Sequence, residues 1–386
     1  MQIVCHAFPA WDGNYLKSTV ELMKRLAERG HQVLYVDYAY TWKDFFTQPP
    51  ATRKRMLGLQ ARIRCIPVTG TGTLQVLTLP PVFPSNFLKQ PVLYDFVNRL
   101  NSVFIRGTIK SAIARLKFHH PVVINAFNPS FGMHLAGKLQ ESFLLYYCYD
   151  EISAANWAGK HGPRLEKQFI QVCDAVVCSS EGLQTKLASQ HPNVQVVKNG
   201  VDFKQFFHRL PLEMLPPIPG KTPGQKVIGY LGSVDDRLDF ALLESQFRRF
   251  SDALFVFVGR VQEVSIQQRL LAFPNVYLAG AFPATDLQGW VQQMDVCLIP
   301  FVKNKFTAGI YPLKINEYLA AGKSVVSTRF APLQEFEEIV FLTESAHFGD
   351  AIQRALDSGE KPEYQAFARK NDWMERAAQL EKIIGA

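Results

Sequence analysis

Short apolar runs alternate with amphipathic segments along the chain, and this pattern predicts strands and helices in turn. Gln2–Phe8 is typical of a strand buried on both faces. Lys17–Arg29 follows with apolar residues at helical spacing, and Gly30 is placed to end that helix. His31–Asp37 predicts a second strand. Strand, helix and strand in this order form a βαβ unit, so the chain begins as a parallel α/β sheet.

The same alternation continues to the end of the chain. Further strands are predicted at Pro121–Ala126, Phe143–Tyr149, Ala175–Cys178, Val194–Val197, Lys226–Leu231, Phe255–Val258, Val276–Ala279, Asp295–Pro300 and Ser324–Thr328. Leu210–Gly224 interrupts the pattern with prolines and glycines, as a linker does. We therefore expect two Rossmann-like α/β domains, at residues 1–208 and 225–366, joined by a linker at 209–224. A C-terminal helix at 367–386 is expected to pack back on the first domain.

Composition fits this architecture. The chain has 386 residues, 47% hydrophobic and 20% charged, which is enough for two substantial cores. No apolar run reaches the roughly 18 residues that span a bilayer, and the first residues lack the pattern of a signal peptide. The six cysteines form no CxxC pair, so buried free thiols in a cytoplasmic protein are expected, without a disulfide framework or a bound metal.

Positive charge is concentrated in two segments that also carry large apolar residues. The net charge is +8, which indicates an anionic partner. Tyr40–Arg64 and Asn86–Phe118 each hold six Lys or Arg residues against one acid. Basic amphipathic helices of this kind bind anionic membrane surfaces, but the same pattern also fits helices packed on a sheet with a solvated basic face. No nucleic-acid motif accompanies the charge, so nucleic acid is not expected as a partner.

Asp295–Thr328 is the stretch that most clearly predicts a ligand site. A buried strand leads into a basic loop, then into a short helix that starts at Pro312 and ends before Gly322. A loop of this type brings backbone N–H groups and positive charge to a helix N-terminus at the carboxyl end of a parallel strand. Such a place favours phosphate. An ordinary βαβ crossover with a solvated loop remains the alternative.

Several motifs together resemble the group 1 glycosyltransferases, which have the GT-B fold and use nucleotide-sugar donors. The motifs are NGVD at Asn199–Asp202, GYLGSVDDRLD at Gly229–Asp239, NVYLAG at Asn275–Gly280 and PLKINEYLAAGKSVVST at Pro312–Thr328. The N-terminal stretch Trp11–Asp37 is similar to the teichuronic-acid and exopolysaccharide branch of that family. The resemblance implies two Rossmann-like domains that face each other across a cleft.

The resemblance also implies a set of donor-binding residues. Glu317 matches the second glutamate of a Glu–seven residues–Glu motif and would bind the ribose hydroxyls of the nucleotide. The first glutamate is replaced by Gly309. The remaining donor contacts are expected from Gly232, Ser233, Arg237, Ala308, Gly309, Ile310, Tyr311 and Lys314.

The catalytic and acceptor residues are implied more loosely. Negative charge builds on the departing diphosphate during glycosyl transfer, and fixed cations stabilise it. Arg237 and Lys314 are candidates for this role, although Arg237 could instead pair with Asp235 or Asp239 on its own loop. Asp150 follows a predicted strand end where α/β folds place their chemistry. The acceptor-side candidates are His6, Asp12, Gly13, Asn128 and Glu151.

The sequence therefore predicts a GT-B glycosyltransferase that moves a sugar from a nucleotide diphosphate-sugar to a saccharide or lipid-linked acceptor. The family implies cell-surface polysaccharide synthesis, retention of configuration at the anomeric carbon and no required metal or other cofactor. The protein is expected in the cytoplasm, with an association to the inner face of the membrane left open. Two alternatives share the fold: a nucleotide-sugar 2-epimerase, and a non-catalytic partner protein, which the glycine at position 309 invites.

Overall fold

A computed structural model describes residues 1–12, 18–154, 158 and 160–385. These residues form two compact units. Unit 1 comprises Met1–Lys198 with Arg376–Ala386, and unit 2 comprises Asn199–Glu375. The boundary thus precedes the predicted linker at 209–224, which lies inside unit 2.

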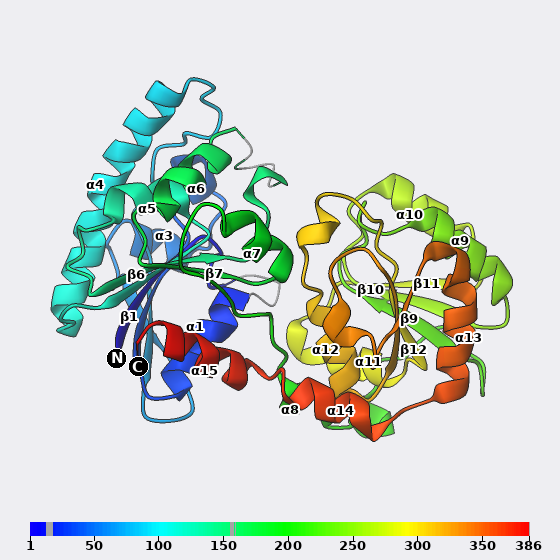
Figure 1. Ribbon diagram of the computed structural model, residues 1–386. Helices are drawn as coiled ribbons and strands as arrows, with labels where there is room; N and C mark the ends of the chain where they lie inside the picture. The colour runs from blue at the N-terminus through cyan, green and yellow to red at the C-terminus, as the bar shows by residue number, and fades with distance from the viewer. Residues whose placement is uncertain (13–17, 155–157, 159, 386) are drawn as a thin grey trace. The chain divides into compact units, whose positions relative to one another are not determined.

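Unit 1 is built on a mixed sheet that is parallel apart from one edge strand. Its strands are β1 (Gln2–Ala7), β2 (Gln32–Val36), β3 (Ile63–Ile66), β4 (Thr73–Leu77), β5 (Val122–Ala126), β6 (Phe143–Cys148), β7 (Ala175–Cys178) and β8 (Val194–Val196). Their order across the sheet is β3-β4-β2-β1-β5-β6-β7-β8, and only β3 runs antiparallel, against β4. Strands β5 and β7 are buried at every residue and β6 at every residue after its first, because helices lie over both faces (Figure 1).

The helices of unit 1 differ widely in length. They are α1 (Ser18–Glu28), α2 (Trp42–Phe45), α3 (Pro50–Met56), α4 (Pro91–Leu116), α5 (Pro129–Leu135), α6 (Gly162–Ile170) and α7 (Glu181–Leu187). The last helix, α15 (Trp373–Ile383), belongs to unit 1 from Arg376 onward. Its Glu381 carboxylate pairs with Arg29 and, at 2.8 Å, with His31 Nε2, so the chain end is fixed beside α1 and β2.

Unit 2 is a parallel sheet with helices on both sides. Its strands are β9 (Val227–Leu231), β10 (Leu254–Val258), β11 (Val276–Gly280), β12 (Val296–Ile299), β13 (Ser324–Thr328) and β14 (Phe341–Thr343). The order β11-β10-β9-β12-β13-β14 places β9 and β12 at the centre. Its helices are α8 (Phe203–Phe207), α9 (Phe240–Arg249), α10 (Val264–Leu271), α11 (Leu287–Gln292), α12 (Leu313–Ala320), α13 (Phe348–Ser358) and α14 (Pro362–Arg369).

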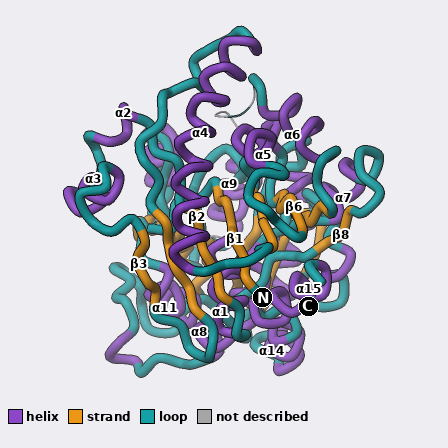
Figure 2. The backbone as a smooth tube through the Cα atoms, turned by 90° about the vertical axis from the view of Figure 1, so that its left-hand side faces the viewer, coloured by secondary structure: helices purple, strands orange, loops and turns teal. Residues whose placement is uncertain are grey.

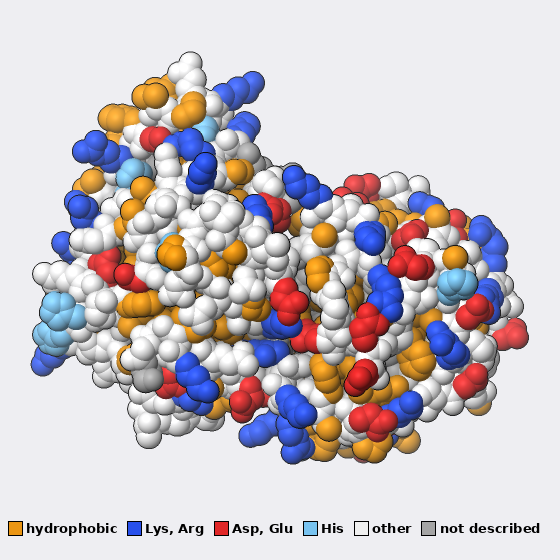
Figure 3. Space-filling model, in the orientation of Figure 1, with side chains coloured by type: hydrophobic (Ala, Val, Ile, Leu, Met, Phe, Trp, Pro, Cys, Tyr) orange, Lys and Arg blue, Asp and Glu red, His pale blue; other side chains and the backbone are white. Residues whose placement is uncertain are grey.

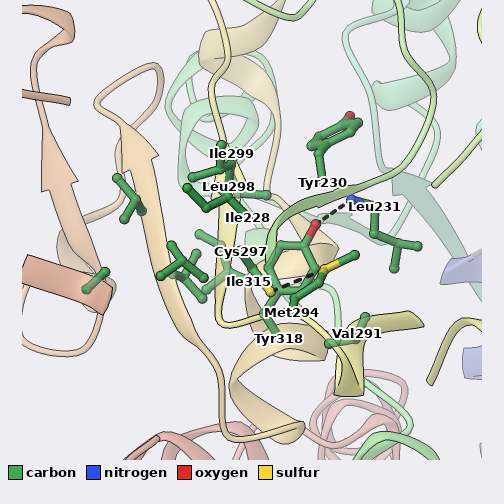
Figure 4. Close-up of a cluster of buried hydrophobic side chains, with 14 of the residues drawn as sticks. Ile228, Tyr230, Leu231, Val291, Met294, Cys297, Leu298, Ile299, Ile315 and Tyr318 are labelled. Atoms are coloured by element: carbon green, nitrogen blue, oxygen red, sulfur yellow. Dashed lines mark hydrogen bonds between the residues drawn. The ribbon is translucent and has the colours of Figure 1, made fainter. Parts of the chain in front are cut away.

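The core of unit 2 fixes α12 against the two central strands. Ile315 and Tyr318 of α12 are fully buried among side chains of β9 and β12 (Figure 4). The Tyr318 hydroxyl accepts a hydrogen bond of 2.7 Å from the backbone N–H of Leu231, the last residue of β9. A buried hydrogen bond of this kind sets the position of α12 relative to the loop that follows β9.

The structure confirms the α/β class with two Rossmann-like units, and it differs from the prediction in local places. Tyr40–Arg64 is divided into α2, α3 and the start of β3, so it is not one amphipathic helix. The strands β3, β4 and β14 were not predicted, since they are short or carry polar residues on half of their positions. All six cysteines are free thiols, five of them buried and Cys65 exposed. Within the described residues, no helix is both long enough and apolar enough to cross a membrane.

Candidate functional site

The loop after β9 approaches its neighbours more closely than a side chain would allow. Gly232 has φ +141°, and its N–H donates to the carbonyl of Val258 at the end of β10. A Cβ on Gly232 would lie 3.0 Å from Lys314 Nζ and would overlap Lys314 Cε. A Cβ on Gly259 would overlap the carbonyl oxygen of Gly232. Glycine at position 232 is therefore what lets Lys314 reach the carboxyl end of the central strand.

Two charged residues of α12 lie at this strand end. Lys314 is in the first turn and Glu317 is in the second, and Glu317 is only 6% exposed. Burial lowers the pKa of Lys314, and nearby Arg237 lowers it further, while Glu317 and Asp235 act to raise it. Burial raises the pKa of Glu317, against the opposing charge of Lys314. The two groups therefore stabilise each other's charged form in a site that is poorly solvated.

Arg237 extends this set of charges from the loop after β9. Its guanidinium makes two hydrogen bonds to the Asp235 carboxylate, Nε to Oδ1 at 2.8 Å and Nη2 to Oδ2 at 2.6 Å. It also lies over the ring of Phe301, 5.6 Å from its centre. Asp235 is buried, so the pair holds Arg237 in one orientation. Sequence reasoning gave this pairing as the alternative to a phosphate contact, and it did not identify Asp235 as the residue that positions Arg237.

Gly232, Asp235, Arg237, Lys314 and Glu317 together form what we call the Gly232 cluster. Two cations and two carboxylates influence one another there, at the carboxyl end of β9 and the N-terminal part of α12. Cations and a helix N-terminus favour an anion, and a buried carboxylate can accept hydrogen bonds from hydroxyl groups. The cluster therefore has the chemistry to bind a phosphorylated molecule that also carries hydroxyls.

The loop between β12 and α12 is folded on itself and contributes less than predicted. The backbone N–H groups of Ala308, Gly309 and Ile310 already donate to carbonyl oxygens of Asn304, Phe306 and Thr307, at 3.0, 3.2 and 3.0 Å. The expectation that these N–H groups face a diphosphate is therefore not supported by their hydrogen bonding. Helix α12 has no side-chain cap at Pro312, and the N–H of Ile315 donates to the Pro312 carbonyl at 3.2 Å, so the N–H groups of Leu313 and Lys314 are the better placed donors.

A chain of amide side chains holds Tyr311, two residues before α12, in place. Asn199 Nδ2 donates to the carbonyl of Tyr311 at 3.3 Å, and Asn316 Nδ2 donates to the Tyr311 hydroxyl at 3.2 Å. Asn371 Nδ2 donates in turn to Asn316 Oδ1 at 3.0 Å. Sequence reasoning missed this network, although the NGVD motif contains Asn199. The predicted donor residue Tyr311 is thus a packed residue that fixes the start of α12.

Acceptor-side candidates of unit 1 gather at the carboxyl edge of its parallel strands. His6 of β1 is in register with Asn125 of β5, and their side chains approach to 3.4 Å. Asn125 Oδ1 also accepts a hydrogen bond of 2.9 Å from the backbone N–H of Asn128. Burial lowers the pKa of His6 to about 4, and its Nε2 has no hydrogen-bond partner among the described residues. His6 and Asn128 are therefore close in space, each in contact with Asn125, and both are buried.

The other candidates of unit 1 are engaged with neighbouring side chains. Asp12 pairs with Arg64 at 2.5 Å, and its side chain is 62% exposed. Glu151 accepts from Lys186 at 2.5 Å and from Ser153; burial acts to raise its pKa, but these hydrogen bonds outweigh burial and lower it. Asp150 is exposed just beyond β6. Gly13 lies outside the described residues.

No candidate metal centre accompanies these groups within the part of the chain that the structure describes. There is no set of three or more His, Cys, Asp or Glu side chains there that could hold a metal ion. Within the Gly232 cluster, the Arg237 guanidinium contacts the Asp235 carboxylate directly.

Comparisons with known protein families and sequences find similarity to glycosyltransferases. Residues 225–358 match the family described as "Glycosyl transferases group 1". TuaH of Bacillus subtilis (strain 168), which is named as a teichuronic acid biosynthesis glycosyltransferase, is 27% identical over 236 residues. That match covers 57% of this chain and 59% of the relative.

Solved structures resemble the chain over almost its whole length. Sucrose-phosphate synthase (tll1590) from Thermosynechococcus elongatus has a TM-score of 0.65 at 16% identity, covering 99% of this chain and 96% of that one. Anabaena Alr3699/HepE, solved in complex with UDP and glucose, has a TM-score of 0.65 at 14% identity, covering 100% and 99%. At these identities the likeness shows the fold, which is GT-B.

Proposed function

We propose that this chain, which carries a group 1 glycosyltransferase domain on a GT-B fold, transfers a sugar from a nucleotide diphosphate-sugar to a saccharide or lipid-linked acceptor. The observation that carries the proposal is the Gly232 cluster, which lies inside the matched residues 225–358. The proposed setting is cell-surface polysaccharide synthesis, because TuaH is named for such a pathway.

The Gly232 cluster can bind two parts of the donor with different groups, the ribose with a carboxylate and the diphosphate with a cation. Glu317 is buried one turn into α12, where its carboxylate can accept both hydroxyls of a ribose. Lys314 lies closer to the helix start, beside Gly232, where a diphosphate would also receive the first-turn N–H groups of α12. This order along one helix matches the order of ribose and diphosphate in a nucleotide diphosphate-sugar.

The same groups support the chemical step. Cleavage of the bond between the anomeric carbon and the phosphate oxygen leaves an additional negative charge on the diphosphate. Lys314 and the dipole of α12 stabilise that charge, and Arg237 adds a second cation oriented by Asp235. In this proposal the protein supplies the positive charge, so no metal is required.

The Gly232 cluster does not determine the configuration of the product at the anomeric carbon, and Gly309 is the residue that bears on it. It stands where the family pattern has its first glutamate, so the donor sugar lacks that carboxylate. Retention of the anomeric configuration is proposed from the family pattern alone. The anomeric configuration of the product, read by NMR, decides it.

The acceptor is proposed to bind at the carboxyl edge of the unit 1 sheet. His6 and Asn128 are close together there, and Asp150 follows the adjacent strand β6. A lipid-linked acceptor would place the protein at the cytoplasmic face of a membrane, to which it would bind peripherally.

A donor-hydrolysis and transfer assay tests the proposal. The purified protein is incubated with UDP-, GDP-, dTDP- and ADP-sugars in EDTA, with and without a lipid-linked saccharide acceptor. We expect release of one nucleoside diphosphate that increases at least tenfold with acceptor and a new glycosylated product. An epimer formed from the nucleotide sugar alone would show a 2-epimerase instead. Donor binding without any turnover would show a non-catalytic partner.

A further inference from the structure

Helix α4 places its polar and apolar residues on the opposite sides from those of an ordinary surface helix. In its first half the buried positions are Tyr94, Asn98, Asn101 and Ser102, and each is hydrogen-bonded inside unit 1. The Asn101 side chain makes two hydrogen bonds to Phe83, both of 2.9 Å: Oδ1 accepts from the backbone N–H, and Nδ2 donates to the carbonyl oxygen. These polar contacts fix the rotation of the helix, so its outward face is a property of the fold.

The outward face of this half is apolar. Helix α4 lies on the outside of unit 1 (Figures 1 and 2), and its Phe96 and Phe104 are 60% and 58% exposed. We call the whole surface the α4 outer face, and its exposed apolar members are Phe87, Val92, Leu93, Phe96, Leu100, Val103 and Phe104. The six residues on α4 follow the helical repeat and form a continuous stripe, and Phe87 lies in the segment before the helix. A contiguous exposed apolar stripe with a polar border indicates an interaction surface.

Basic residues border this stripe without acidic partners. Arg99 and Arg106 lie on one flank of the helix, Lys110 extends the stripe by a turn, and Lys89 precedes the helix. Among the described residues, none of these four has a carboxylate within ion-pair distance, while the single acid of the helix, Asp95, is paired with Arg164. Figure 3 shows Lys and Arg side chains interspersed with hydrophobic ones over this part of unit 1. The surface is thus apolar in its middle and positive at its border.

We propose that the α4 outer face docks on an anionic lipid bilayer, with α4 lying along the membrane surface. The apolar stripe would enter the boundary between headgroups and acyl chains, and the arginine and lysine groups would contact lipid phosphates. A second copy of the chain would bring the same unpaired cations against these, so self-association through this face is disfavoured. At about 1.5 Å per residue, the 26 residues of α4 lie along roughly 39 Å of membrane.

The proposal rests on the proposed function only for the placing of the acceptor at a membrane. It identifies the element that makes the contact. It also assigns the membrane contact to α4 and not to the other basic segment, Tyr40–Arg64, which the structure divides into short elements.

Vesicle flotation of the full-length protein tests the proposal. Vesicles of phosphatidylcholine alone are compared with vesicles containing 30% phosphatidylglycerol, at low and at physiological salt. We expect flotation with the anionic vesicles and at least tenfold less with the neutral ones. The triple variant Arg99→Gln, Arg106→Gln, Lys110→Gln is expected to bind roughly 100-fold more weakly, since each cation near such a surface contributes about a fivefold gain. The double variant Phe96→Gln, Phe104→Gln should lose binding without a change in charge.

A matched control removes the same charge elsewhere. Lys204, Lys221 and Lys370 are exposed residues of unit 2, and their replacement by Gln is expected to leave vesicle binding within twofold. The proposal is overturned if this control weakens binding as much as the α4 variants do, or if wild-type protein does not float. It is also overturned if the α4 variants change only the oligomeric state. Nucleoside diphosphate binding, measured without vesicles, should be equal in all these variants, so failure of the docking proposal is distinguishable from failure of the proposed function.

Discussion

The ammonium group of Lys314 occupies space that exists only because residue 232 has no side chain. A Cβ at Gly232 would lie 3.0 Å from Lys314 Nζ. The two residues come from different elements, the loop after β9 and the first turn of α12. The hydrogen bond from the Leu231 backbone N–H to the Tyr318 hydroxyl fixes the position of α12 relative to that loop. A side chain at position 232 would therefore move the ammonium group of Lys314.

Gly232→Ala is predicted to displace Lys314 and weaken nucleoside diphosphate binding by at least tenfold. The new methyl group overlaps the lysine side chain, and the φ of +141° adds backbone strain of about 1–3 kcal/mol. Isothermal titration calorimetry measures the affinity, and denaturant unfolding measures the free energy of unfolding.

Gly220→Ala is the control for backbone strain alone. Gly220 also has a positive φ, of +78°, but a Cβ there would meet no atom within 4 Å. This variant should lose some stability and keep its nucleotide affinity. Equal losses of affinity in both variants would show that Lys314 is not the reason for glycine at position 232.

Lys314 is predicted to set the alkaline limit of turnover. Burial lowers its pKa, so its ammonium form is lost at a lower pH than that of an ordinary lysine near 10.4. Activity that requires the cation should therefore fall as pH rises through this lowered value. The pH profile of kcat measures this limit.

Two variants separate charge from structure at position 314. Lys314→Met should lower kcat by roughly 100- to 1,000-fold at pH values below the lowered pKa of Lys314, where the wild type carries the cation, as expected for a group that stabilises charge in the transition state. Lys314→Arg keeps the charge at high pH, so it should retain part of the activity and lose the alkaline decline. An unchanged alkaline limb in the arginine variant would contradict this role.

His6 is predicted to make unit 1 less stable in mild acid. Its pKa is about 4 in the folded protein and about 6.5 in the unfolded chain, so between these values the unfolded chain binds the additional proton. Stability is therefore full above about pH 6.5 and decreases as pH falls toward 4, by up to about 3 kcal/mol. Denaturant unfolding at several pH values checks this slope.

His6→Gln should remove most of that pH dependence while leaving the slopes from other histidines. The exposed His119, replaced in the same way, is the control and should leave the slope as in the wild type. If the two variants have the same pH dependence, burial of His6 is not its cause.

The central strands of both sheets could be predicted from the sequence because they are continuous apolar runs. Val122–Ala126 in unit 1 and Val227–Leu231 in unit 2 are buried at every residue. The short strand β14 and the edge strand β3 carry no such signal. Their existence depends on neighbours that are distant in sequence.

The site could be predicted only as far as local motifs reach. Lys314 and Glu317 are three residues apart on one helix, so a motif contains both. Asp235 was seen only as an alternative partner of Arg237, because its burial depends on the packing of the loop after β9. The orientation of α4 was likewise hidden, since its buried asparagines become favourable only through hydrogen bonds to Ser85 and Phe83.

Glu317 provides the most direct test of the account, because it combines burial on α12 with the proposed ribose contact. Calorimetric titration of the wild type with UDP, GDP, dTDP and ADP, in EDTA, should show one site with a preference for one base. Glu317→Gln should weaken that binding at least tenfold, whereas Glu338→Gln, an exposed carboxylate of the same unit, should not change it. Absence of binding by every nucleoside diphosphate, or equal affinity in the Glu317 and Glu338 variants, would contradict the proposed donor site.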